Sequence, residues 1–472
     1  MSHEIRADYN QMFLIPPSLD ELLPGNHPAR FVREFVDSLD LKGMGFKVPH
    51  TDEGRPCYAS DLLLKVWVYG FLERIRSCRG LEKACRQHVS LMWLTGMHYP
   101  DHNSLWRFWR DNRKALKEVF RKTVQLAIKL ELVDMALCAV DGTKMASAGS
   151  TRAIWNKKKL EETLARLEKL LNKAMGEVEA AEKSETGEYA LPDKLKETVA
   201  LRDKVREKLQ ELDKEQRDQM HPQEREAEVM KTQEGKRLGY NAQAAVDGKA
   251  GIIVAAEVTT EQNDKHQLVP MMEAAREMTG KAAAETVADA GYFSGEQLAR
   301  AEDQNLSVTV SLKELEKAEE GGGDFHASKF TYDGQRDCCM CPLGGVLTYE
   351  CTKQASGKDY EIRQYRCHNF RQCPRRWECS KDKRGRTMQV SPYRGQILRQ
   401  KEKHKNGAAR ELLKKRMGII EPVFAWIKHL LGFRRWSMRG LQKARDQWAL
   451  VCAVVNLSKI YHRSGVAAVR GA

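Results

Sequence analysis

The chain has 472 residues, an apolar fraction of 42% and nine tryptophans, which is enough for a core shared among roughly two to four domains. Its formal net charge of +14 predicts an anionic partner, most often nucleic acid, although a basic protein without such a partner is the alternative. No apolar run reaches the roughly 18–20 residues that span a bilayer, and the N-terminus lacks the apolar segment of a signal peptide. We therefore expect a cytoplasmic protein without membrane contact, whose 12 cysteines are reduced.

Residues 1–130 are typical of short helices separated by turns. Apolar residues recur at helical spacing after Ser60 and again over 81–89, and a third helix is expected over 105–120. Arginines fall on the expected helix faces, which favours a DNA-binding domain of the helix-turn-helix kind. A helical packing domain with solvated arginines fits these residues equally well.

A short apolar strand ending at Asp141 follows, and the composition then changes. Residues 156–234 are crowded with Lys, Glu, Leu and Ala, and they predict an inserted antiparallel helical hairpin with a break at 184–192. Its charges are most simply a solvated face. The apolar stripes expected in the two arms are Leu160, Leu164, Leu167 and Leu171, then Leu195, Leu201, Val205 and Leu209.

Strands and helices alternate again from 235 to 324. Residues 240–246 and 252–258 predict a β-hairpin, and further strands are expected up to Asp289 and over 307–311. Helices are expected over 265–278, after Ser294, and from about 406 to 461. Together with 131–155 and the C-terminal segment 393–472, these residues predict one mixed α/β unit.

Three acidic residues hold prominent places in this unit. Asp141 and Asp289 each close an apolar strand, and Glu421 is expected to open a helix. An Asp beside a Gly is usually a turn residue, so each acid alone is weak evidence. Together they could bind Mg²⁺, which prefers carboxylate oxygens, and two such ions about 3.5–4 Å apart promote phosphodiester cleavage.

The order and context of these acids resemble the DDE transposases of bacterial insertion sequences, in the ribonuclease-H-like superfamily. The resemblance covers roughly residues 10–463. It is carried by Val140-Asp141-Gly142-Thr143, Gly239-Tyr240-Asn241-Ala242-Gln243, Ala288-Asp289-Ala290-Gly291-Tyr292 and Ile420-Glu421-Pro422-Val423-Phe424, with Gly432-Phe433-Arg434-Arg435 after them. It implies a mixed-sheet α/β catalytic core of the ribonuclease-H-like fold, an all-α N-terminal domain, an inserted helical hairpin and a Cys-rich insertion over 325–392.

The resemblance also implies an activity and its residues. The enzyme would bind the terminal inverted repeats of its element, cleave a DNA strand with Mg²⁺ or Mn²⁺, and join the 3′ end to target DNA. The implied metal ligands are Asp141, Asp289 and Glu421. The implied phosphate contacts are Lys428, Arg434, Arg435 and Arg439.

The spacing after Glu421 fits that assignment. Lys428 and Arg435 follow at intervals of seven residues, nearly two helical turns, so the three share one face if the helix continues past Gly432. A solvated charged stripe is the alternative. Arg416 is one position away from the arginine that the family places before its Glu, which leaves its role open.

Seven cysteines fall within the basic, aromatic-containing segment 325–392. Cys338 and Cys341 have the spacing of a zinc knuckle, and four thiolates suffice for a tetrahedral zinc site. Reduced cysteines without metal are the alternative, and the arginines and aromatics could track nucleic acid or simply form a small core. The family's Cys-bearing insertion implies a structural zinc ion held by Cys341, Cys367, Cys373 and Cys379, with Cys338 as the first substitute.

Two other functions remain open. A non-catalytic DNA-binding regulator would keep the same scaffold, although the presence of all three acids disfavours it. A metal-dependent nuclease would use the same acids without strand transfer, and only a joining assay separates it from a transposase. Because joining two DNA ends usually requires more than one protomer, we expect a homodimer or larger assembly on DNA, associated with the bacterial nucleoid.

Overall fold

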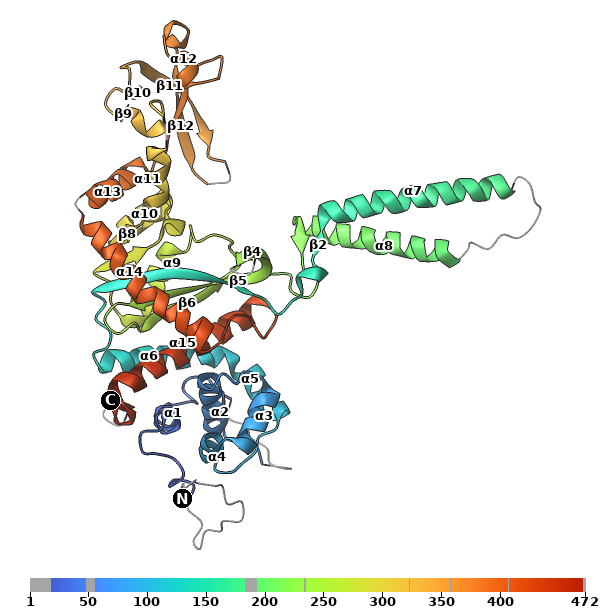
Figure 1. Cartoon of the computed structure of the whole chain (residues 1–472), viewed down its shortest axis with the longest axis vertical. Coiled ribbons are helices and arrows are strands. Elements are labelled where there is room, and N and C mark those ends of the chain that lie inside the picture. Colours follow the sequence, from blue (N-terminus) through green and yellow to red (C-terminus); the bar gives the residue numbers. More distant parts are fainter. Residues whose placement is uncertain are drawn as a thin grey trace, which may run out of the picture.

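The computed structural model describes residues 18–47, 56–182, 193–232, 235–321, 323–356, 359–405 and 407–469. Four parts are distinct in Figure 1: N-terminal helices at one end, an α/β unit in the middle, a small β-rich module at the other end, and a helical hairpin that projects sideways. The helices within these ranges are all too short or too polar to span a bilayer. The break that we expect in the hairpin at 184–192 lies outside the described residues.

The N-terminal helices are α1 (Pro28–Asp37), α2 (Ser60–Leu72), α3 (Cys78–Gln87), α4 (Val89–Thr95), α5 (His102–Asn112) and α6 (Leu116–Lys129). Two of the expected helices are divided. His88 has an extended backbone that separates α3 from α4, and a 3₁₀ turn over Arg113–Ala115 (η1) separates α5 from α6. The apolar residues of these helices join the core of the α/β unit, mainly where α6 packs on the C-terminal helix α15 (Leu441–Ser464).

Six strands of the described chain form the central mixed sheet. They are β1 (Leu137–Ala146), β4 (Glu228–Thr232), β5 (Gly235–Asp247), β6 (Ile253–Thr259), β7 (Glu285–Ala288) and β8 (Val308–Val310). Their order is β4-β5-β1-β7-β8, with β6 also paired to β5. β5 runs antiparallel to β1, β4 and β6, whereas β7 is parallel to β1 and β8 is parallel to β7. The predicted mixed α/β unit and its hairpin are confirmed.

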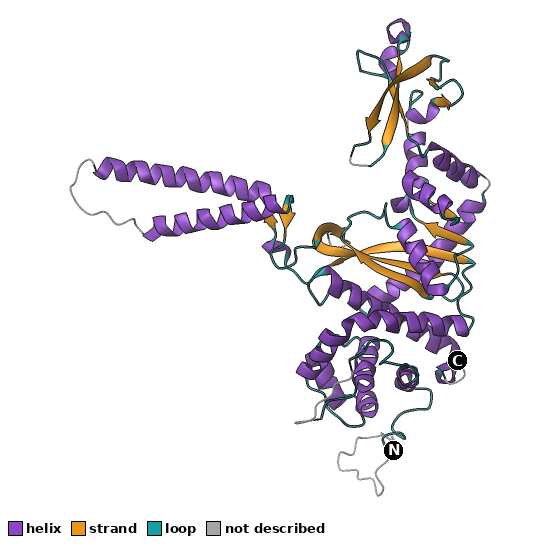
Figure 2. Cartoon of the chain, turned by 180° about the vertical axis from the view of Figure 1, so that it is seen from behind, coloured by secondary structure: helices purple, strands orange, loops and turns teal. Residues whose placement is uncertain are grey.

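Helices cover this sheet. α9 (Leu268–Thr279) and α15 pack against β6, α10 (Gly295–Asp303) packs against α9, and α14 (Ala408–Ala425) crosses β1, β7 and β8. Figure 2 shows this six-stranded sheet apart from the smaller sheet of the β-rich module.

The first strand does not end at Asp141, contrary to our expectation. β1 continues through Ala146, because its antiparallel partner β5 pairs with it as far as Ala146 opposite Gly239. What ends before Asp141 is the parallel ladder with β7, whose last pair is Val140 with Ala288.

The inserted hairpin consists of α7 (Lys157–Glu182) and α8 (Asp193–Lys214), joined at its base by β2 (Trp155–Asn156) and β3 (Gln219–Met220). Leu167, Leu171 and Val205 are buried between the arms as predicted. Leu201 is 49% exposed, so its predicted place in the stripe is wrong; Leu212 is the further buried position of α8.

The Cys-rich segment forms an antiparallel sheet in the order β13-β12-β11-β10-β9. Its strands are β9 (Thr331–Asp333), β10 (Cys338–Met340), β11 (Val346–Gln354), β12 (Glu361–Cys367) and β13 (Thr387–Val390), and the short helix α12 (Arg376–Cys379) precedes β13. This β-rich module has its own small core around Phe330, Leu347 and Tyr365. α11 (Lys313–Glu320) leads into it from β8.

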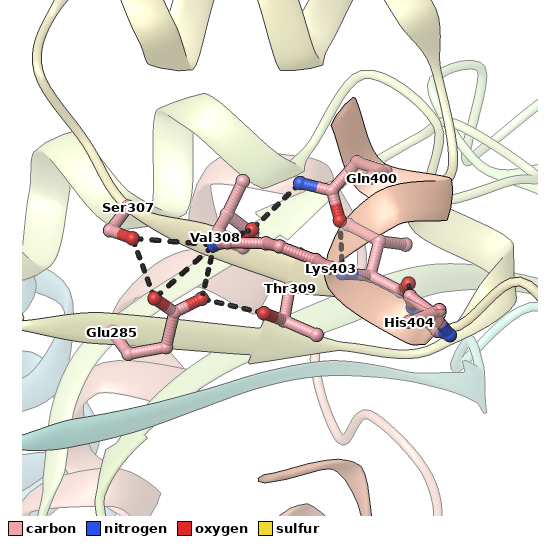
Figure 3. Close-up of polar contacts among 8 residues, drawn as sticks. Glu285, Ser307, Val308, Thr309, Gln400, Lys403 and His404 are labelled. Carbon is pink, nitrogen blue, oxygen red and sulfur yellow. Dashed lines mark hydrogen bonds and ion pairs between the residues drawn. The ribbon is translucent and has the colours of Figure 1, made fainter. Parts of the chain in front are cut away.

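The chain returns from the module through α13 (Arg394–Lys405), which starts well before the helices expected from 406. α13 covers the edge strand β8 with side chains in place of a further strand (Figure 3). Gln400 Nε2 donates to Val308 O at 2.8 Å, and the His404 ring bonds Val310 O at 2.9 Å. Lys403 reaches Val308 O at 3.1 Å and pairs with Glu285. These contacts protect the β8 edge against pairing with another chain and fix the module to the α/β unit.

Candidate active site

The β1/β7 ladder brings two of the predicted acids together. Its last pair is Val140 with Ala288, and the next residue on each strand is an aspartate, Asp141 and Asp289. Asp141 Oδ1 accepts from the Gly142 amide at 2.8 Å. Asp289 Oδ1 accepts from the Gly291 amide at 2.9 Å and caps the 3₁₀ turn Ala290–Tyr292 (η3). Parallel pairing therefore delivers two carboxylates to the same edge of the sheet.

The environment of Asp141 disfavours its negative charge. Burial is the main cause, and the Asp289 carboxylate adds to it; together they raise the pKa of Asp141 to about 6, from an ordinary value of 3.8, although Arg416 opposes them. The Arg416 guanidinium pairs with Asp141 Oδ2 at 3.1 Å, and both side chains are largely buried. A bound cation would relieve the repulsion between two such carboxylates.

Arg416, whose role the sequence leaves open, is therefore part of the site. It lies on α14 in helical register with Ile420 and Val423, which are both fully buried against the sheet. This register is readable from the sequence: an arginine on the apolar stripe of a helix needs a buried acid as partner.

Glu421 is the predicted acid that the structure does not bring to the other two. It does not open a helix, because α14 begins at Ala408 and carries Pro422 in its interior. Glu421 is exposed, and it follows Arg416 by five residues, which turns it roughly 140° away from that side chain. Within the described residues no three acidic, His or Cys side chains are arranged to hold a metal ion. The predicted triad stays a prediction.

Lys428 lies near Asp141, on the helical turn that directly follows α14. Residues Trp426–Leu430 form a π-helical turn (η6) that continues α14. Burial lowers the pKa of the Lys428 ammonium while the Asp141 carboxylate opposes this change, so the two groups are electrostatically coupled. Lys428 lines a cavity of about 140 Å³. Its lining includes four basic residues, Lys144, Lys428, His429 and Arg434.

The other predicted phosphate contacts have partners in the protein. The helix stops before Gly432, which has a φ of 63°, so Arg435 does not share the face of Glu421 and Lys428 as expected. Arg435 Nε instead donates to Ser147 O at 2.7 Å, and its Nη2 donates to the carbonyls of Ala148 and Gly149. Arg439 donates to Gln223.

Two family models match parts of the chain. Residues 340–461 match a family model described as a transposase DDE domain, and residues 17–111 match one described as a transposase domain (DUF772). The two matches indicate an insertion-sequence DDE transposase. A search of curated proteins found no match. The first match includes Glu421 and Lys428 but begins after both aspartates, and the second spans α1 to α5.

The four predicted zinc cysteines lie near one another in the β-rich module. Burial raises the pKa of the Cys367 thiol, and Cys341 and Cys373 add to the effect. Burial likewise raises the pKa of Cys379, with the other three thiols contributing and Arg386 opposing. Cys338 is buried in β10. No metal-holding arrangement is present among the described residues, so the zinc site is not shown.

A further acid that the sequence did not indicate, Asp264, lies near Asp289. Asp264, in the loop after β6, accepts hydrogen bonds from Asn241 Nδ2 and Gln243 Nε2, both at 2.7 Å. Both donors stand in the β5 block that carries the family resemblance. No periodicity or motif marks Asp264 itself, because its place depends on how the loop folds back over β5.

Proposed function

We propose that the transposase cleaves and joins DNA strands at the Asp141–Asp289 pair with bound Mg²⁺ or Mn²⁺. The observation that carries the proposal is the position of these two part-buried carboxylates immediately beyond the β1/β7 ladder. Asp141 is also coupled to Lys428, which lines a basic cavity. Carboxylate oxygens are the ligands that Mg²⁺ prefers, and the ion would supply activation of the attacking hydroxyl and stabilisation of the leaving oxygen. Asp141 and Asp289 would hold it.

The sheet supports a ribonuclease-H-like core in this proposal. Three antiparallel strands, β6, β5 and β1, adjoin two parallel strands, β7 and β8. In chain order β1 is the first and β7 the fourth of these five strands, and the two aspartates come directly after the last pair of the β1/β7 ladder. The hairpin between β1 and β5 and the module between β8 and α14 are insertions that leave this order intact.

Glu421 is proposed as the third ligand. Arg416 contacts Asp141 from one side along the helix, and Lys428 is coupled to it from the other. Glu421 lies between Arg416 and Lys428 in the chain, so its position along the helix axis is level with the two aspartates. Rotation of the segment around Pro422 and the π-helical turn would direct its carboxylate toward the aspartates when metal and DNA are bound.

The basic cavity is proposed to receive a phosphate of the DNA strand. Lys428 and Arg434 were predicted for this role, and Lys144 extends the lining from β1. Arg435 and Arg439 remain predicted phosphate contacts, but their present hydrogen bonds to Ser147 O and Gln223 would have to be exchanged. The N-terminal helices are proposed to recognise the terminal inverted repeats, and two protomers are proposed to assemble on the paired ends.

The test is strand cleavage of a DNA end from the element in the presence of Mg²⁺. We expect Asp289→Asn to abolish cleavage while end binding in a gel-shift assay is retained. The matched control is Asp303→Asn, an exposed aspartate at the end of α10, which should cleave like the wild type. Cleavage by Asp289→Asn at the wild-type rate would overturn the assignment.

Two outcomes separate the alternative functions. DNA binding by the wild-type protein without any metal-dependent nicking would identify a regulator. Nicking without the joining of pre-cut ends to a target duplex would identify a nuclease.

We also propose a structural zinc ion held by Cys341, Cys367, Cys373 and Cys379. The support is that Cys341 and Cys373 lie close enough to add to the raised pKa of the Cys367 thiol, and that these three thiols add to the raised pKa of Cys379. Metal analysis of the purified chain should find about one zinc ion, lost in Cys379→Ser and retained in Cys338→Ser. A zinc-free wild-type protein with a folded module would refute the site.

A further inference from the structure

A polar cluster lies on the face of β1 opposite to the Asp141 side chain. In the β1/β5 ladder Gly142 stands opposite Gln243, and Lys144 stands opposite Asn241. Residues directly opposite in an antiparallel pair share a face, and neighbours along a strand alternate between faces. Asn241 and Gln243 therefore lie on the face of Gly142, and Asp264 joins them there by accepting from both amides.

Gly142 allows this cluster to approach the residue next to Asp141. A Cβ at position 142 would come within 2.3 Å of Gln243 Nε2, 2.8 Å of Asp264 Oδ1 and 3.0 Å of Asn241 Oδ1. No side chain fits in that space. The glycine after Asp141 therefore serves close packing within a continuous strand, not a turn.

The same cluster reaches the turn that carries Asp289. Gln243 Oε1 accepts from the hydroxyl of Tyr292, a fully buried side chain in η3. The Tyr292 amide in turn donates to Asp289 O at 3.3 Å. A Cβ on Gly291 would lie 3.1 Å from Asp289 Oδ1 and 3.6 Å from Asp264 Oδ2, so both carboxylates border that glycine.

The cluster is costly to bury, which argues that it is more than packing. Asn241 and Gln243 are both completely buried, and Asn241 Oδ1 has no hydrogen-bond partner among the described residues. Apolar residues at these two strand positions would avoid that penalty. What the amides achieve is a chain of hydrogen bonds from Asp264 through Gln243 to the Asp289 turn, beside the backbone of Asp141.

We propose that Asp264 is a positioning residue that, through Asn241, Gln243 and Tyr292, sets the spacing of Asp141 and Asp289. It contacts neither the metal nor the DNA in this role. The inference rests on the proposed function, in which the two aspartates share divalent metal. Groups that orient metal ligands from behind typically change metal affinity or activity about 10–100-fold when they are removed.

Two measurements test the role of Asp264. The first is the Mg²⁺ concentration that gives half-maximal strand cleavage. The second is Mn²⁺ binding to the full chain with its DNA end, followed by electron paramagnetic resonance without turnover. Asp264→Ala should raise the Mg²⁺ requirement and weaken Mn²⁺ binding by about tenfold or more. Asp303→Ala serves as the control and should change neither value.

A conservative variant distinguishes positioning from ligation. Asp264→Asn keeps an oxygen that accepts from Asn241 and Gln243, so it should stay within about threefold of the wild type. Tyr292→Phe removes only the hydroxyl at the other end of the hydrogen-bond series, and it should raise the Mg²⁺ requirement severalfold. This variant provides a test even if Asp264→Ala fails to fold.

The outcomes separate the two proposals. Equal losses in Asp264→Asn and Asp264→Ala would overturn positioning, because the charge itself would then be required. Unchanged Mn²⁺ binding in Asp264→Ala and Tyr292→Phe would also overturn it. A wild-type protein that binds Mn²⁺ at the aspartates without cleaving DNA would refute the proposed function alone.

Discussion

The sheet and the helix of the candidate site differ in how firmly they hold their acids. Asp141 and Asp289 come directly after the last residue pair of the β1/β7 ladder, and hydrogen bonds from Gly142 and Gly291 fix one oxygen of each. Glu421 stands exposed on α14, directly before a proline in the helix interior and five residues before a π-helical turn, two features that commonly mark bends or functional sites. The sheet thus holds two of the three proposed metal ligands in place before metal binds, whereas the helix leaves the position of the third, Glu421, adjustable.

Replacing a sheet-borne aspartate should have the largest effect. Asp141→Asn removes a carboxylate that the proposal places on the metal, so Mg²⁺-dependent strand cleavage should fall to background. A cleavage assay on a DNA end checks this, with gel-shift binding of the same DNA as the control. A variant that cleaves normally would show that the prebuilt pair is not the catalytic centre.

Replacing the helix-borne glutamate should affect activity without affecting stability. Glu421→Gln should lose at least about 100-fold in cleavage rate if the carboxylate joins the metal. Its free energy of unfolding should stay within about 0.5 kcal/mol of the wild type, because the side chain is exposed. Cleavage kinetics and urea unfolding measure the two quantities. An active Glu421→Gln variant would restrict the site to the sheet.

In the metal-free protein, Asp141→Asn should increase the stability of the folded state, although it is expected to abolish catalysis. The folded pKa of Asp141 is about 6, above its ordinary 3.8, so the folded state holds this proton more tightly than the unfolded state. The stability that protonated Asp141 contributes to the fold is fully present below about pH 4, and it is lost as the pH rises to about 6. At pH 7.5 the Asn variant should therefore be more stable than the wild type by about 2 kcal/mol, and equal to it near pH 4.

Urea unfolding at the two pH values, without divalent metal, measures this difference. Adding Mg²⁺ should reverse the order at pH 7.5, because only the wild type retains both ligands. The same protonation predicts that the Mg²⁺ concentration needed for cleavage rises as the pH falls below about 6. A pH-independent requirement would contradict the assigned shift.

Straightening the helix should have the smallest effect. Pro422→Ala restores a backbone N–H to the interior of α14 and so favours the orientation in which Glu421 is exposed. We expect cleavage to slow a few fold while the melting temperature stays the same or rises. Faster cleavage would mean that Glu421 reaches the site without the adjustment that we propose.

The aspartate pair was predictable because strand patterning is local. An apolar run closed by Asp occurs twice, and parallel strands bring such residues to one edge. The end of β1 was misplaced because Gly142 was taken for a turn residue, whereas the partner β5 continues the strand and the polar cluster behind it requires the glycine.

Glu421 was expected to open a helix because Pro422 also suits a helix first turn, whereas both residues lie in the interior of α14. The exposure of Glu421 follows from the apolar stripe of α14, because the buried side chains Ile420 and Val423 determine which face of the helix packs on the sheet. Asp264 could not be predicted, since its contacts arise only when the loop after β6 packs over β5. The Cys quartet was selected through family resemblance, and its proximity agrees with that choice.

The most direct test of the central claim is to count the Mn²⁺ ions bound by the full chain on its DNA end, for the wild type and for Asp289→Asn. We expect saturable binding by the wild type and its loss in Asp289→Asn, with weaker but detectable binding in Glu421→Gln. Undiminished Mn²⁺ binding by Asp289→Asn would contradict this claim.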